Sequence, residues 1–232
     1  MHIGARLETI GRLVPEGCRL ADIGTDHAYL PVWLLQQGHI TGAIAGDIAA
    51  GPCQAARSTI AMYGMGSRAE VRLGSGLEVL QPGEVDCVAI AGMGASTMIE
   101  IFEASPAVVA GTKVMVLQPM AGAASLRRYL NTHGWVITAE ELVDDPPHFY
   151  EIIKAEPAPV GGAEPAPYTE IDCIVGPVLL SQGHPLLTKH IERQRDYYRR
   201  LMENMARSEK ARSSTKYAEA QELLKALEAL EV

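Results

Sequence analysis

The chain has 232 residues, 47% of them hydrophobic, and its formal net charge at pH 7 is −8. This length permits one substantial α/β domain plus an appendage. No apolar run is long enough to span a bilayer, and no signal-peptide pattern opens the sequence. A net acidic chain is not a general nucleic-acid-binding protein. The four cysteines are widely spaced without a CxxC pair, which predicts buried thiols in a reducing cytoplasm rather than a metal site: Cys18, Cys53, Cys87 and Cys173.

The first predicted element is an amphipathic helix over residues 1–14, whose apolar side chains recur at helical spacing. Pro15 and Gly17 end this helix. Arg6 lies near its start and permits two interpretations. It is either a solvated surface arginine or a guanidinium that folds over a ligand cleft.

The segment RLADIGTDHAYLP, residues 19–31, predicts a short buried strand, a turn and the start of a helix at His27. Asp22 lies at the carboxyl end of the strand, and Gly24 opens the turn. Because ligands bind at this edge of open α/β sheets, Gly24 permits close approach of a nucleotide-like ligand and Asp22 offers an acceptor to an ammonium or hydroxyl group. A dinucleotide fingerprint requires G-x-G-x-x-G, but Asp26 stands at the second glycine position, which favours a ligand without phosphates. The structural alternative is an ordinary strand–turn–helix.

A second strand is predicted over residues 41–47 and ends at Asp47. Asp47 follows Gly24 by 23 residues, close to the offset of about 20 expected for a carboxylate that binds ribose hydroxyls. The alternative role is to cap the helix that begins near Gly51, and one aspartate can serve both roles.

Two further strands run into glycine-containing turns. The strand at 69–73 precedes Ser75 and Gly76, where a backbone N–H group or the Ser75 hydroxyl is placed to meet an adenine ring, although such a turn is also a common loop. The strand at 86–91 runs directly into Gly92, which predicts a second site of close backbone approach.

A fifth strand is predicted at 112–117, and the alternation of strands and helices over residues 19–130 predicts a parallel, doubly wound α/β sheet. Strands at 135–142 and 150–155 flank an acidic, proline-rich turn, so we expect an antiparallel hairpin at one edge. A mostly parallel Rossmann-like sheet with an antiparallel last strand is the layout of class I S-adenosylmethionine-dependent methyltransferases.

Six ordered motifs resemble the bacterial tRNA adenosine N1-methyltransferase family called TrmK. They are DIGTDHAYLP (22–31), AGDIAAGP (45–52), RLGSGL (72–77), IAGMG (90–94), LQP (117–119) and YEII (150–153). The resemblance covers nearly the whole chain. The family usually has serine at position 25, glutamate at 47, aspartate at 75 and glycine at 95. The change at position 75 leaves open whether Ser75 replaces a carboxylate contact to the cofactor.

The resemblance implies methyl transfer from S-adenosyl-L-methionine to N1 of the adenosine at position 22 of tRNA. It places the cofactor on Asp22, Gly24, Asp26, His27, Asp47, Gly76 and Gly92, with Arg6 and Tyr29 beside this cleft as substrate-binding candidates. N1 attacks the methyl group directly, so no covalent enzyme intermediate is needed and no metal is expected.

Three residues of the first turn are the catalytic candidates. The enzyme has to extrude the target adenine from its stack, and holding N1 of this base near the methyl group supplies much of the rate enhancement. Asp26 and His27 are candidates to stabilise the cationic product, and Tyr29 is a candidate to stack on a base. The alternatives are a His27 bonded to local backbone and a buried Tyr29. The identity of a general base stays open.

The composition changes after residue 156, which we expect to end a Rossmann-like catalytic domain spanning residues 1–156. Residues 157–183 are expected to form a linker and connecting segment, rich in proline and glycine at first and strand-like at 171–180. Residues 184–232 predict a helical coiled-coil hairpin with a break at 208–215.

Charge is distributed unevenly along the chain. Residues 1–183 hold 10 basic and 20 acidic residues, a net charge of −10, whereas residues 184–217 hold 9 basic and 4 acidic residues, a net charge of +5. The basic helical arm is able to bind tRNA backbone through residues such as Arg199 and Arg200. The alternative is a solvated coiled coil that serves solubility or dimerisation, so the oligomeric state stays open.

Two functions from other classes are compatible with the sequence. One is a Rossmann-type oxidoreductase, which the missing glycines disfavour. The other is a noncatalytic module that binds RNA or a partner protein through the coiled coil.

Overall fold

The computed structural model describes residues 1–159, 161 and 166–231 of the chain. The chain divides into two compact units, an N-terminal unit (Met1–Pro165) and a C-terminal unit (Ala166–Val232). Within the described ranges, no helix combines the length and the apolar character needed to cross a lipid bilayer.

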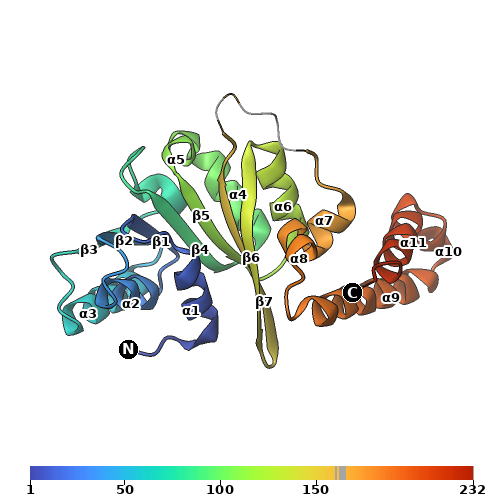
Figure 1. Cartoon of the computed structure of the whole chain (residues 1–232), viewed down its shortest axis with the longest axis horizontal. Coiled ribbons are helices and arrows are strands. Elements are labelled where there is room, and N and C mark those ends of the chain that lie inside the picture. The colour runs from blue at the N-terminus through green and yellow to red at the C-terminus, as the bar shows by residue number, and fades with distance from the viewer. Residues whose placement is uncertain (160, 162–165, 232) are drawn as a thin grey trace. The chain divides into compact units, whose positions relative to one another are not determined.

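A seven-stranded sheet in the order β3-β2-β1-β4-β5-β7-β6 forms the centre of the N-terminal unit (Figure 1). Its strands are β1 Arg19–Ile23, β2 Gly42–Asp47, β3 Ala69–Leu73, β4 Cys87–Met93, β5 Val114–Pro119, β6 Trp135–Asp145 and β7 His148–Pro157. The first five strands are parallel, and β7 runs antiparallel to both β5 and β6. The predicted Rossmann-like sheet is therefore confirmed, with its antiparallel last strand β7 and the predicted hairpin, formed by β6 and β7, at one edge.

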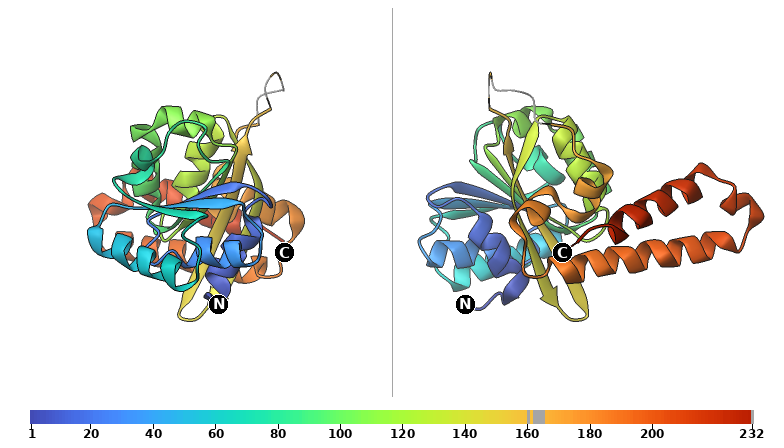
Figure 2. Two further views of the ribbon diagram at one scale, coloured as in Figure 1. Left: turned by 90° about the vertical axis from the view of Figure 1, so that its left-hand side faces the viewer. Right: turned by 45° about the vertical axis from the view of Figure 1, so that its right-hand side comes forward.

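Helices cover both faces of this sheet (Figures 1 and 2). One face carries α1 Gly4–Leu13, α2 Tyr29–Gln36 and α3 Ala50–Met62, and the other carries α4 Ala95–Ala104, α5 Pro106–Gly111 and α6 Ala123–Thr132. A short 3-10 helix spans Gly76–Val79. Because helices cover both faces, the central strands are near-continuous apolar runs, such as the buried residues of β5.

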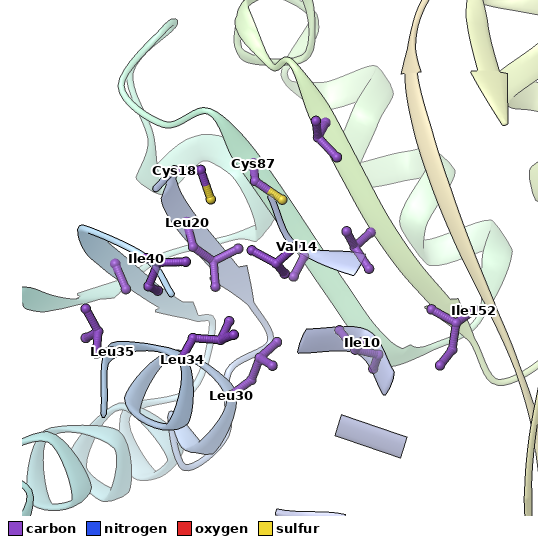
Figure 3. Packing of buried hydrophobic residues seen from close by; sticks show 14 of the residues in the cluster. Ile10, Val14, Cys18, Leu20, Leu30, Leu34, Leu35, Ile40, Cys87 and Ile152 are labelled. Atoms are coloured by element: carbon purple, nitrogen blue, oxygen red, sulfur yellow. The ribbon is translucent and has the colours of Figure 1, made fainter. Parts of the chain in front are cut away.

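The core on one face joins α1 and α2 to the sheet (Figure 3). Ile10 of α1 packs in one buried cluster with Leu20 of β1, Leu34 of α2 and Ile152 of β7. Gly11 permits this approach, because a Cβ there would lie 2.7 Å from a ring carbon of Trp33. The packing holds α1 against β5, β6 and β7. The four cysteines are buried and free, as predicted.

The C-terminal unit is helical and contains an antiparallel hairpin of two long helices (Figures 1 and 2). Its elements are α7 Glu170–Val175, α8 Pro177–Gln182, α9 Leu187–Ala206, α10 Glu209–Arg212 and α11 Thr215–Glu228. The predicted helical hairpin is confirmed as α9 and α11, and α10 lies within the predicted break.

The strand-like interpretation of residues 171–180 is wrong, because this segment forms α7 and α8. Thr169 and Asp172 make a capping box: the Asp172 N–H donates to Thr169 Oγ1 at 3.1 Å, and the Thr169 N–H donates to Asp172 Oδ2 at 2.8 Å. Pro177 then starts α8 as its first-turn proline. The T-x-x-D spacing of residues 169–172 is a sequence signal for the start of a helix, whereas the apolar residues that follow suit a strand and a buried helix alike.

Candidate active site

Two cavities open at the carboxyl ends of the central strands, where the strand order reverses between β1 and β4. The first, of about 370 Å³, is lined by Ile23, Gly24, Asp47, Ile48, Ser75, Gly76, Leu77, Met93, Thr97, Glu100, Ile101, Ala104 and Ser105. The second, of about 310 Å³, is lined by Arg6, Leu7, Asp22, Gly24, Thr25, Asp26, His27, Tyr29, Leu30, Ala91 and Gly92. Gly24 lines both, so the two cavities meet at the turn after β1.

Asp22 is a buried carboxylate in the wall of the second cavity, with 6% of its surface exposed. The Thr25 hydroxyl donates to Asp22 Oδ2 at 2.6 Å. Burial raises the pKa of Asp22 to about 6, although the Thr25 hydrogen bond and the charge of Arg6 oppose the shift. Among the described residues every fully buried side-chain N or O atom has a hydrogen-bond partner. Within the described residues the other Asp22 oxygen accepts no such bond, so it is not fully buried, and Asp22 lines the second cavity.

Gly24 is required by the shape of the turn. Its φ is +73°, and a Cβ at this position would lie 2.3 Å from the Met93 methyl carbon. The N–H groups of Gly24 and Thr25 both donate to the Gly46 carbonyl, at 2.8 and 3.1 Å. The turn is therefore fixed to β2, and its surface is bare backbone where the two cavities meet.

Asp47 serves the local backbone and also lines the first cavity. Its Oδ1 accepts the Ala49 N–H at 2.9 Å at the start of α3, and its Oδ2 accepts the Asp26 N–H at 3.4 Å. Asp26 and Ala28 have φ of +52° and +55°, so α2 begins at Tyr29 rather than at the predicted His27. The Asp26 side chain is 72% exposed.

The rings at the mouth of the second cavity form a stack. His27 and Tyr29 lie with ring centroids 5.1 Å apart and an interplanar angle of 8°. His27 Nε2 lies 3.6 Å from Asp26 Oδ1. Tyr29 is 42% exposed, so the alternative of a buried tyrosine is wrong.

Arg6 is a cleft residue rather than a solvated surface arginine. It donates from Nη1 to Gln118 Oε1 at 2.7 Å, and its guanidinium lies 5.4 Å from the centre of the Tyr150 ring. It shares the second cavity with Asp22. The guanidinium is therefore held by a neutral amide and an aromatic ring.

Most of the predicted site residues come together at this edge, whereas the two predicted arginines of the hairpin belong to the C-terminal unit. Arg199 pairs with Glu228 and Asp196, at 3.0 and 3.3 Å. Arg200 donates from Nε to the Asp196 carbonyl at 3.1 Å. In the part of the chain that the structure describes, no three His, Cys, Asp or Glu side chains are grouped to hold a metal ion.

Several site residues were missed from the sequence. Gln118 and Tyr150 lie in the LQP and YEII segments, yet no role was assigned to them. Met93 and Glu100 line the first cavity, and Glu100 gives it a second carboxylate besides Asp47. The positions of Gln118 and Tyr150 near the ends of β5 and β7 could have indicated site residues. No feature of the neighbouring sequence indicates that Glu100, within a helix, lines a cavity.

Known proteins are similar to this chain in sequence and in fold. A family model described as a methyltransferase domain matches residues 3–153. The tRNA (adenine(22)-N(1))-methyltransferase of Bacillus subtilis (strain 168) is 30% identical over 229 residues, which cover 97% of this chain and 96% of that protein.

Solved structures are similar over the same extent. The crystal structure of the B. subtilis m1A22 tRNA methyltransferase TrmK has a TM-score of 0.86 at 28% identity, covering 98% of this chain and 97% of that one. A Streptococcus pneumoniae protein solved in complex with S-adenosyl-L-methionine has a TM-score of 0.81 at 28% identity, and the match covers 98% of each chain.

These matches support the methyltransferase interpretation over the oxidoreductase and the noncatalytic module. They extend through both units, because each full-length match covers at least 97% of this chain. The chain belongs to the TrmK family of tRNA (adenine(22)-N(1))-methyltransferases, with a class I methyltransferase domain in its N-terminal unit.

Proposed function

We propose that this protein methylates N1 of the adenosine at position 22 of tRNA, with S-adenosyl-L-methionine as the methyl donor. The observation that carries the proposal is the pair of joined cavities at the β1/β4 switch point, lined by Asp22, Gly24 and Asp47, in a chain of this family. The activity of the B. subtilis relative, stated in its name, supports the same reaction.

The two cavities fit the two ends of this cofactor. Asp47 in the first cavity is an acceptor for ribose hydroxyls, and Ser75 and Gly76 lie beside it for the adenine ring. Asp22 in the second cavity is an acceptor for the α-ammonium group, and Gly24 and Gly92 permit close approach there. When bound, the cofactor supplies an electrophilic methyl group on a sulfonium sulfur.

The residues at the mouth of the second cavity are placed to receive the target base. The Tyr29 ring, stacked on His27, offers an exposed aromatic face to an extruded adenine. The Asp26 carboxylate and the His27 imidazole are the groups that stabilise the positive charge developing on the methylated ring. Arg6 supports the substrate beside them. Positioning of N1, rather than a covalent intermediate, supplies the rate.

The hairpin of α9 and α11 is the proposed tRNA-binding element, supported by the net charge of +5 over residues 184–217. The cytoplasm is the proposed compartment, supported by four free, buried cysteines.

The experiment is methyl transfer to unmodified tRNA, followed by mass-spectrometric mapping of the nucleosides. The expected product is 1-methyladenosine at position 22, and a transcript with guanosine at that position is the matched control. The Asp26→Asn variant is expected to lower turnover more than cofactor affinity, the sign of an interaction made mainly in the transition state. Methylation elsewhere, or none, contradicts the proposal.

A further inference from the structure

One side of α9 carries four basic residues, one aromatic residue and one amide residue, with the exposed acids Asp196 and Glu203 beside them. Lys189, Arg193, Tyr197, Arg200, Asn204 and the C-cap residue Arg207 follow one another at steps of four, four, three, four and three, and all six are exposed. This spacing places them on one side of a helix, over a length of about 27 Å at 1.5 Å per residue. We call these six residues the basic stripe.

The opposite side of α9 belongs to the interior of the C-terminal unit. Leu187 and Ile191 are 3% and 2% exposed, and α9 packs against α11. The six residues of the basic stripe are exposed, whereas Leu187 and Ile191 are buried.

A second column of arginines on α9 is used within the hairpin. Arg195 donates from Nε and Nη2 to the Leu227 carbonyl, at 3.0 and 2.8 Å, and pairs with Glu192. Arg199 pairs with Glu228 of α11 and with Asp196. These two arginines pair with Glu192 and Asp196, which lie between the two columns, so the structure separates Arg199 from its neighbour Arg200, with which it shared an expected role.

Tyr197 lies near the middle of the basic stripe and is 57% exposed. It meets the Tyr198 ring edge-on, at 5.2 Å and 86°. Proteins that bind single-stranded nucleic acids combine exposed aromatic rings with cations. Bases stack on the rings, and the cations bind the backbone phosphates. In a symmetric dimer formed through this face, the four cations of one copy would face the four cations of the other. The repulsion between them disfavours a second copy of this chain as the binding partner.

We propose that the basic stripe is the RNA-contacting face of the hairpin, with its cations on backbone phosphates and Tyr197 stacked on an unpaired base of the tRNA. The proposal rests on the proposed function. It adds which face of α9 contacts the tRNA, which residues make the contacts, and whether each contacts a phosphate or a base. It assigns Arg200 to the RNA and Arg199 to the hairpin.

The first test compares two adjacent arginines in the full chain. Binding of unmodified tRNA is measured against salt concentration for Arg200→Gln and for the matched control Arg199→Gln. Arg200→Gln is expected to reduce the salt slope by about 0.7–0.9, the value of one phosphate contact, and Arg199→Gln to leave it unchanged. Equal slopes for the two variants would overturn the proposal.

The second test addresses the stacked base. Tyr197→Ala is expected to weaken tRNA binding about 5- to 150-fold, and Tyr197→Phe, which keeps the ring, to stay near wild type. Wild-type binding by Tyr197→Ala overturns the stacking assignment. Circular dichroism and S-adenosylmethionine affinity, expected to be unchanged in every variant, control for folding.

The outcomes separate this proposal from the proposed function. Variants that all bind tRNA normally, in a protein that still methylates adenosine 22, overturn the stripe alone. A change of oligomeric state in the stripe variants, without loss of tRNA binding, overturns it in favour of an interface between copies. A wild-type protein that methylates no tRNA refutes the proposed function itself.

Discussion

Asp22 is a buried carboxyl group whose pKa is raised to about 6, so its charge depends on pH where an exposed aspartate is already ionised. Between pH 3.8 and about 6 the native state binds more protons than the unfolded state. The stability of the ligand-free protein therefore falls as pH rises through this window, by about 3 kcal/mol in all.

The protonation of Asp22 is also expected to make cofactor binding depend on pH. A cationic α-ammonium favours ionised Asp22, so affinity for S-adenosylmethionine is expected to rise as pH increases through about 6, measured by calorimetry from pH 5 to 8. His27 is another ionisable group of this cavity, so Asp22→Asn is the control that isolates Asp22. A variant that keeps the wild-type pH profile would exclude Asp22 as the cause.

Asp47 combines a local role with its place in the first cavity. Asp47→Ala is expected to weaken cofactor binding by about 1–3 kcal/mol, the cost of leaving ribose hydroxyls without a charged partner. The loss is measured by calorimetry and compared with that for a 2′,3′-dideoxy cofactor analogue. The variant also loses the bonds to Ala49 and Asp26. Equal losses for cofactor and analogue would show that Asp47 acts through the turn rather than on the ribose.

At the scale of elements, a buried ion triad ties α6 to the hairpin of β6 and β7. Arg127 is fully buried and lies 2.7 Å from carboxylate oxygens of both Glu140 and Glu151. Burial alone would lower the pKa of Arg127, but the two carboxylates more than offset it and raise the pKa. Next to Glu151, Tyr150 contacts Arg6, so the hairpin also supports the second cavity.

Removal of the Arg127 guanidinium, the cation of this triad, is expected to destabilise the fold. Arg127→Met leaves two carboxylates without their cation and is expected to lower the free energy of unfolding by about 3–5 kcal/mol, measured by urea denaturation. A triple variant with apolar residues at all three positions is expected to recover most of the loss, because no charge remains buried. A cost below about 1 kcal/mol would show that the triad is not a structural link.

At the scale of the whole molecule, we propose that the N-terminal unit binds the cofactor and that the C-terminal unit binds tRNA. Every residue that lines the two cavities precedes residue 120. A chain that ends at residue 165, the boundary between the units, is therefore expected to bind S-adenosylmethionine within about threefold of the full chain and to lose tRNA methylation. Calorimetry and a methyl-transfer assay measure the two properties. Wild-type methylation by the shortened chain would place tRNA recognition in the N-terminal unit.

The strands and their end residues were predictable from the sequence because their signals are local. Buried parallel strands are short apolar runs, and the carboxyl ends of such strands meet at one edge. Asp22, Gly24 and Asp47 could therefore be assigned to one site without knowledge of the packing. The segment at 171–180 failed for a related reason, since its apolar residues suit a strand and a buried helix equally.

The sequence by itself determined the sheet, the glycine-containing turns and the acidic residues at the carboxyl ends of β1 and β2. Only the tertiary structure decided that Arg6 reaches Gln118, 112 residues away, that Glu100 lines the first cavity, and that Arg199 pairs with Glu228 of α11. These contacts depend on how helices pack on the sheet and on each other. Packing brings together residues that are distant along the chain, and a short sequence pattern does not identify the distant residue that a side chain will contact.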